Sequence, residues 1–154
     1  MIGEIEKIIE NKLCGSVVYG KGTGSIISIG FGDKIKRKVP LRNDQLTEES
    51  KNYTFELELI IYCCWRIRTS DSIILGWRDA LCDDKMKEIN TLSKRKVTGV
   101  KIDPSTYDIK IEFSGDLFLE IMCDITNDFD SDDNYIFYTK SNTYAVGINS
   151  SYLK

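Results

Sequence analysis

Two short stretches of the sequence bring together residue types that are able to do chemistry. The first, Gly20-Lys-Gly-Thr-Gly-Ser25, combines glycines and a lysine, as phosphate-binding loops do. Such a loop leads into a helix, because the N–H groups and the dipole of the helix end hold the phosphate. Here the next segment, IISIGF, alternates like a strand, and no Gly-Lys-Ser/Thr triplet is present. We therefore interpret the glycines as the turn of a hairpin.

The second stretch is acidic. Asp128, Asp130 and Asp132 have the spacing that opens a calcium-binding loop, in which alternating carboxylates converge on one cation. The sixth position of such a loop is a glycine and the twelfth is a glutamate, but this chain has Asp133 and Thr139 there. We therefore predict a solvated acidic loop, and we expect no metal and no other cofactor.

The reactive residue types point away from an enzyme. The chain has no histidine, which is the commonest general base and the commonest metal ligand. Adjacent Cys63 and Cys64 would point to opposite faces of a strand and would not converge on zinc. The odd number of cysteines favours reduced, buried thiols at Cys14, Cys63, Cys64, Cys82 and Cys123. The sequence thus predicts a protein without catalytic residues.

The charge distribution favours a protein partner. The net charge is -3 with a pI near 5.1, which argues against nonspecific binding to nucleic acid or to an anionic membrane. Eight acids and no Lys or Arg occur between Ile111 and Thr139. One interpretation is the solvated face of a sheet. The other is a surface for a basic partner, with candidate binding residues Glu112, Glu120, Asp128, Asp130, Asp132 and Asp133.

The location in the cell follows from two further features. The longest apolar run, residues 60–65, is far shorter than the roughly 20 residues that span a bilayer. The N-terminal segment mixes acids, lysines and isoleucines and does not resemble a secretory signal. We therefore expect a cytoplasmic protein that does not cross a membrane.

The hydrophobic pattern predicts one α+β domain over residues 1–154, rich in antiparallel strands. Its first half contains a helix from Ile2 to near Gly15, a hairpin over residues 17–31, an edge strand over 34–41 and a loop over 43–52. Residues 55–67 alternate as one strand and form a hairpin with residues 73–77. Its odd-numbered side chains face the core, and we place Trp65 and Trp77 there as well.

The second half is expected to repeat part of the first. A short helix begins at Asp83 or Asp84 and carries Met86, Ile89 and Leu92. A meander over residues 97–102, 107–113 and 117–123 follows, and a hairpin over 135–148 ends the chain. A weak echo matches Val18 with Val97 and Phe31 with Phe113, which favours two related units of helix, strand and strand.

Three segments carry a family resemblance: Cys63-Cys-Trp-Arg-Ile67, Ser72-Ile-Ile-Leu-Gly-Trp-Arg-Asp79 and Tyr107-Asp-Ile-Lys-Ile-Glu-Phe-Ser-Gly-Asp-Leu-Phe-Leu-Glu-Ile121. They resemble a group of small uncharacterised bacterial proteins that are similar to immunity proteins of polymorphic or contact-dependent toxin systems. The resemblance spans most of the chain from Gly20 onward. It implies a domain that binds a cognate toxin inside the producing cell and blocks it by occupancy, with no catalytic residue of its own.

Two other functions remain open at this point. A small-ligand or regulatory binding module would use Ile60, Tyr62 and Cys64 as a pocket wall. A metal-dependent hydrolase would instead use carboxylates from residues 128–133 together with Glu112 or Glu120. A pocket of several hundred cubic ångströms favours the first. A cation held by three or more carboxylates favours the second.

Overall fold

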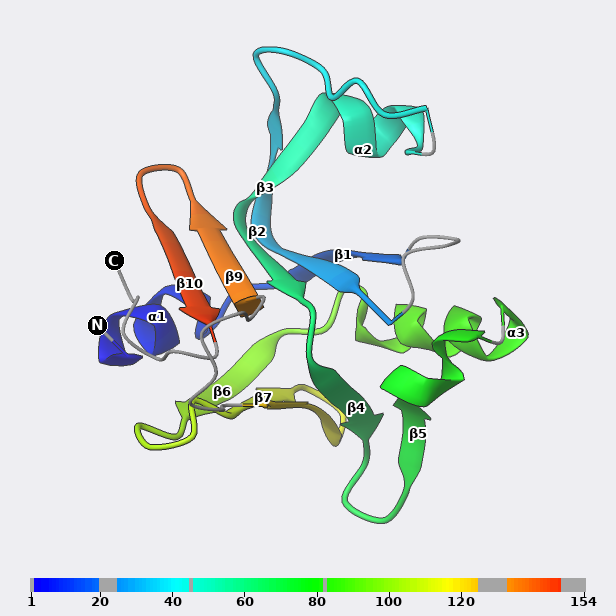
Figure 1. Cartoon of the computed structure of the whole chain (residues 1–154), viewed down its shortest axis with the longest axis vertical. Helices are drawn as coiled ribbons and strands as arrows, with labels where there is room; N and C mark the ends of the chain where they lie inside the picture. Colours follow the sequence, from blue (N-terminus) through cyan, green and yellow to red (C-terminus); the bar gives the residue numbers. More distant parts are fainter. Residues whose placement is uncertain (1, 20–24, 45, 82, 125–132, 148–154) are drawn as a thin grey trace.

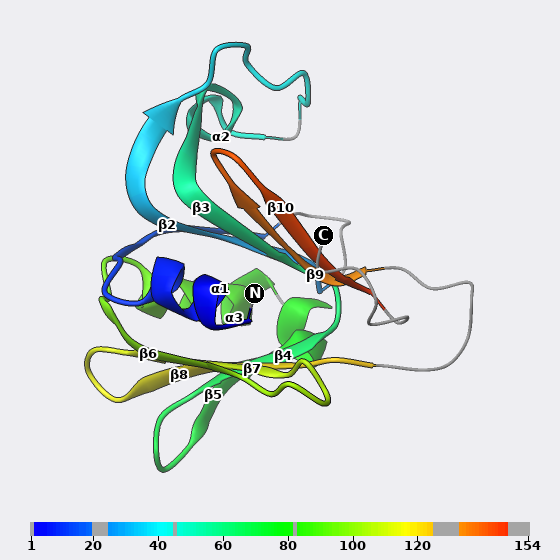
Figure 2. The same cartoon turned by 90° about the vertical axis from the view of Figure 1, so that its left-hand side faces the viewer.

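The computed structural model describes residues 2–19, 25–44, 46–81, 83–124 and 133–147, which form two antiparallel five-stranded sheets (Figures 1 and 2). The first sheet has the order β1 (Cys14–Tyr19), β2 (Ile27–Lys36), β3 (Tyr53–Ile61), β9 (Asp133–Thr139), β10 (Thr143–Gly147). The second has the order β5 (Ile73–Gly76), β4 (Cys64–Arg68), β8 (Leu117–Met122), β7 (Ile109–Phe113), β6 (Val97–Ile102). The predicted α+β fold, rich in antiparallel strands, is confirmed.

Short helices complete the fold. Figure 2 shows α1 (Ile2–Ile9) and α3 (Asp83–Met86) between the two sheet layers. The 3-10 helices η1 (Trp77–Leu81) and η2 (Lys87–Leu92) flank α3 along the chain, and α2 (Glu48–Asn52) stands at one end of the first sheet. None of the helices in the described part of the chain is both long enough and apolar enough to cross a membrane.

Each half of the chain contributes strands to both sheets. The first half places β1, β2 and β3 in the first sheet and then crosses, so that hairpin β4-β5 lies in the second. The second half places β6, β7 and β8 in the second sheet, and hairpin β9-β10 returns to the first. The two halves are therefore equivalent units that exchange their last hairpins.

The equivalence of the units extends to individual hydrogen bonds. The N–H of Cys14 donates to the carbonyl of Arg95, and the N–H of Val97 donates to the carbonyl of Lys12, both at 2.8 Å. A bulge follows Cys14 in β1 and Val97 in β6. The predicted echo is thus real in structure, but the residue of β1 that matches Val97 is Cys14 and not Val18.

The later part of the echo was predicted in the correct register. Phe31 is paired with Cys14, and Phe113 is paired with Val97. The two phenyl rings stack on each other, with centroids 6.4 Å apart and planes 14° apart. Both rings are buried between the sheets, so the equivalent positions of the two units meet in the core.

The long alternating segment was predicted as one strand, and this is wrong in one respect. The chain leaves the first sheet after Ile61 and enters the second at Cys64. The N–H groups of Tyr62 and Cys63 both donate to the carbonyl of Asn134 at the crossing, at 2.9 and 3.1 Å. The inner faces of both sheets meet the same core, so the side-chain alternation continues through the break. The predicted core side chains from Leu57 to Ile67 are buried except for Cys63, which is half-buried; the buried ones are Leu57, Leu59, Ile61, Trp65 and Ile67. The prediction is wrong for Phe55, because a register shift in β2 precedes its pair and its ring packs over Gly15 and Gly30 instead of entering the core.

Several local predictions need correction. Residues 43–52 are not a plain loop, because α2 begins there and the side chain of Thr47 caps it by accepting the N–H of Ser50. β2 continues to Lys36, so no separate strand covers residues 34–41. The first helix ends at Ile9. Trp77 begins η1 and is 37% exposed, whereas Trp65 is buried.

Other predicted elements are confirmed. β1 and β2 form the predicted hairpin, although residues 20–24 of its turn lie outside the described residues. The meander appears as β6, β7 and β8, and the final hairpin as β9 and β10. The second helix is divided into α3 and η2, and it buries Met86, Ile89 and Leu92 as expected.

Candidate functional site

The structure describes three of the six predicted partner-binding carboxylates. Glu112 and Glu120 lie on neighbouring strands of the second sheet, β7 and β8. Asp133 begins β9 in the first sheet and is not brought together with them. The others, Asp128, Asp130 and Asp132, lie outside the described residues.

Glu120 is occupied by cations of its own sheet. Nε of Arg68 donates to its carboxylate at 2.7 Å, Nε of Arg66 donates to the other oxygen, and its side chain is only 15% exposed. The hydrogen bond from Arg68, followed by that from Arg66, lowers the pKa of Glu120. Glu112 pairs with Lys110 at 3.1 Å. The outer face of the second sheet is thus a mixed-charge surface and not the acidic one that the local sequence indicated.

Asp133 lines a pocket of about 650 Å³ where the chain crosses between the sheets. Tyr62 and Cys64, two of the three residues predicted as a pocket wall, line it together with Trp77. The third predicted wall residue, Ile60, lines a different groove on the first sheet. The volume of the 650 Å³ pocket lies within the range of small-molecule binding sites.

The four described cysteines are free thiols, but only Cys14 is buried as predicted, whereas Cys63, Cys64 and Cys123 are partly exposed. Burial raises the pKa of the Cys14 thiol to about 12, and burial also raises that of Cys64. Cys123 contacts Cys63 and donates to the carbonyl of Tyr107 at 3.4 Å, and this contact with Cys63, together with burial, raises its pKa. Cys82 lies outside the described residues. Within the described ranges no three Cys, Asp or Glu side chains are placed to share a metal ion.

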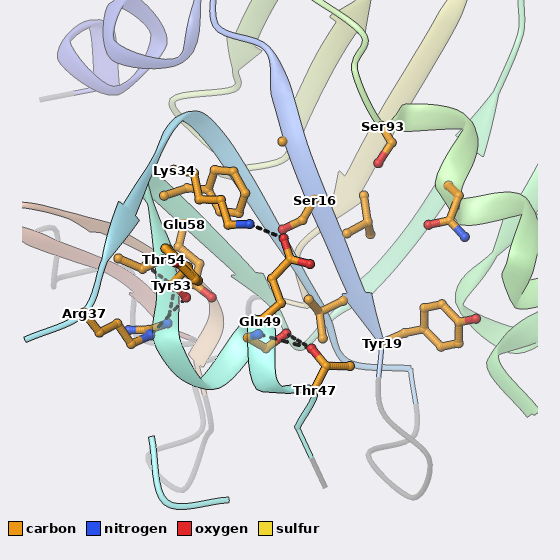
Figure 3. Close-up of a pocket in the computed structure, with 16 residues that line it drawn as sticks. Ser16, Tyr19, Lys34, Arg37, Thr47, Glu49, Tyr53, Thr54, Glu58 and Ser93 are labelled. Atoms are coloured by element: carbon orange, nitrogen blue, oxygen red, sulfur yellow. Dashed lines mark hydrogen bonds and ion pairs between the residues drawn. The ribbon is translucent and has the colours of Figure 1, made fainter. Parts of the chain in front are cut away.

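The outer side of the first sheet carries a groove of about 410 Å³ around β1 (Figure 3). β1 forms its floor, with α2 and the neighbouring part of β2 on one side and Ser93 after η2 on the other. Gly15 and Gly30 leave room for the ring of Phe55, which a side chain at either position would overlap. The bend of β2 and β3 thus places an aromatic ring against the outside of the sheet.

The charged residues on the α2 side of this groove are paired with each other. Lys34 pairs with Glu49 and lies 4.5 Å from the ring centroid of Tyr53. Arg37 donates to the carbonyl of Tyr53 at 3.1 Å and lies 3.8 Å from the carboxylate of Glu58. Figure 3 shows these side chains converging beside β1. The wall therefore presents little net charge.

A second groove of about 430 Å³ lies on the same sheet and shares Arg37, Phe55 and Glu58 with the first. Between and beside the grooves, one uncharged row crosses all five strands: Val18, Ser28, Ile60, Ile136 and Ala145. Tyr62 and Tyr138 are 39% and 38% exposed. We call this row with Tyr62 and Tyr138 the tyrosine face.

Comparison with protein-family models, with curated proteins and with solved structures finds no match for this chain. The sequence did not predict the tyrosine face as a binding surface, because the candidate binding residues were all acids. The sequence signal for this surface is the apolar centre of the even-numbered side chains of residues 55–67, which includes Ile60 and Tyr62. The structure leaves Ile60 half-buried on that face and Tyr62 more exposed.

Proposed function

We propose that this protein is an immunity-type inhibitor, which binds a cognate bacterial toxin domain and blocks it by occupancy. The observation that supports the proposal best is the tyrosine face. Protein interfaces are rich in tyrosine and poor in charge at their centres, with charged residues at the rim. Here Ile60 and Tyr138 lie centrally, and the paired charges of Arg37 and Glu58 lie beside them.

The first test uses the toxin domain encoded beside the gene of this protein. Replacing Tyr62 and Tyr138 together by alanine is expected to weaken toxin binding about 30-fold or more, because exposed aromatic side chains anchor protein interfaces. The affinity is measured by calorimetry, and protection by growth of cells that express the toxin. Ile73→Ala, at a 64% exposed position on β5, is the matched control and should bind normally. Equal binding by the double variant would reject the tyrosine face as the interface.

The acidic segment has a separate predicted role in this function. Replacing Asp130 and Asp132 by lysine is expected to slow association with a basic toxin about tenfold at low salt and to leave dissociation almost unchanged, because exposed charges act mainly by steering. Stopped-flow mixing over a salt series measures both rates. An association rate that does not change at any salt concentration would remove steering by this segment.

A second candidate function is favoured by the 650 Å³ pocket, which is large enough for a small organic ligand. Trp77 lines this pocket, whereas Trp65 is buried in the core. A ligand there is expected to shift the emission of Trp77, and Trp77→Phe should abolish the shift. The measurement is a fluorescence titration with a panel of metabolites. A metabolite that raises the melting temperature of the protein without changing the emission of Trp77 would bind at another site.

A further inference from the structure

The two units end in equivalent edge strands, β1 of the first sheet and β6 of the second. Cys14 and Val97 direct their N–H and carbonyl groups away from the neighbouring strand, because these groups bond to the other unit. Both strands then carry the same bulge. The N–H and carbonyl groups of Val17 and Tyr19 in β1 therefore point away from β2. Those of Val100 and Ile102 in β6 likewise point away from β7.

The edge of β6 is capped by a side chain. The outward N–H of Ile102 donates to the carboxylate of Glu6 in α1 at 2.9 Å. The equivalent N–H in β1 is that of Tyr19. No group among the described residues accepts a hydrogen bond from Tyr19 N–H, and η2, which stands where α1 stands in the other unit, provides no such carboxylate contact. The two equivalent edges therefore differ, because the N–H of Ile102 in β6 is capped by Glu6 and the N–H of Tyr19 in β1 has no such cap among the described residues.

The open edge faces the 410 Å³ groove. Val17 and Tyr19 line this groove from β1, and Asn90 and Ser93 line it from the η2 side. An added strand would lie about 4.8 Å from β1, in the space between these two sides. The charged residues on the α2 wall are already paired, and the nearest side chains of β1 are apolar, so an uncharged occupant fits best.

We propose that the edge of β1 binds an extended, uncharged segment of the partner protein, which adds to the first sheet as a further strand beside Val17 and Tyr19. Main-chain hydrogen bonds to an exposed sheet edge are an established mode of peptide recognition. The proposal takes from the proposed function only the identity of the partner, the toxin domain. The segment would occupy the groove while the tyrosine face contacts the rest of the partner.

The test is amide hydrogen exchange in the full-length protein with and without the toxin domain. The amides of Val17 and Tyr19 are expected to exchange at least about tenfold more slowly in the complex, as they gain hydrogen bonds. The amide of Val100, at the position of β6 equivalent to Val17, is the internal control and should not change.

A matched pair of variants adds a second measurement. Val17→Pro removes an N–H that does not pair with β2, so the hairpin is kept while one bond to the partner is lost. The affinity is expected to fall about tenfold, and Val100→Pro should leave it unchanged. If Val17→Pro does not fold, the exchange measurement on the unchanged protein decides the proposal.

The outcomes separate this inference from the proposed function. Tight toxin binding without protection of Val17 and Tyr19 would overturn the inference and keep the function. If the toxin does not bind, a library of uncharged decapeptides replaces it. Peptides that protect these two amides would keep the inference and reject the toxin as partner, and an absence of binding would reject both. Protection in the protein alone, together with sedimentation as a dimer, would make a second copy the occupant and overturn the proposal.

Discussion

Replacing Leu59 by aspartate is expected to leave the protein unfolded at neutral pH. Leu59 is fully buried at the centre of the first sheet, between Ile29 of β2 and Phe137 of β9. A carboxylate at this position has no partner, and burying it costs about 5 kcal/mol or more, which is comparable to the whole stability of a small domain. Circular dichroism and the dispersion of the amide NMR spectrum measure the effect.

The control for this prediction is on the neighbouring residue. Ile60→Ser lies on the outer side of the same strand, where Ile60 is half-buried, and it should fold with a modest loss of stability. A well-folded Leu59→Asp variant would show that the inner face of β3 does not face the core. The two substitutions together therefore test the assignment of faces.

The second large effect is expected at the stacked phenyl rings. Phe31→Ala and Phe113→Ala should each reduce the free energy of unfolding by about 3–5 kcal/mol, because each removes a large side chain from a tightly packed core. Since the residues are equivalent, the two losses should be similar. Urea denaturation of both single variants gives the comparison.

The double variant measures the contact between the rings. Phe31→Ala with Phe113→Ala should cost less than the sum of the single losses by about 1 kcal/mol, since either substitution alone already removes the stacking. Tyr138→Ala, at an exposed position, is the control and should change stability by about 0.5 kcal/mol or less. Strongly unequal single losses would contradict the equivalence of the two positions, and full additivity would contradict a stabilising contact between the rings.

The fold was predicted in those parts where local pattern and tertiary structure agree. Alternation identified the buried side chains between Leu57 and Ile67 because both β3 and β4 face one core. It failed at Phe55, which the bend of the sheet turns to the outside. It missed the crossing at Tyr62 and Cys63, which depends on hydrogen bonds to Asn134 far along the chain. Trp77 was placed in the core as the end of a paired strand, but the chain turns into η1 at that residue and leaves it partly exposed.

The candidate site was less predictable, for a related reason. Glu120 was read as part of an acidic region because its sequence neighbours are uncharged or acidic, whereas its spatial neighbours are Arg66 and Arg68 on another strand. The pair of Arg37 and Glu58 likewise joins residues from two strands. The distribution of charges along the sequence therefore predicts the charge of a sheet surface only when the order of the strands is known.

The exchange of hairpins between the units ties the integrity of each half to that of the other. β4 pairs with β8, and β9 pairs with β3, so separating either pair would expose the core that the two sheets share. Thermal or chemical unfolding should consequently occur as a single all-or-none event, without a species in which only one half persists. A chain shortened to one half would find its missing strands only in a second molecule of itself.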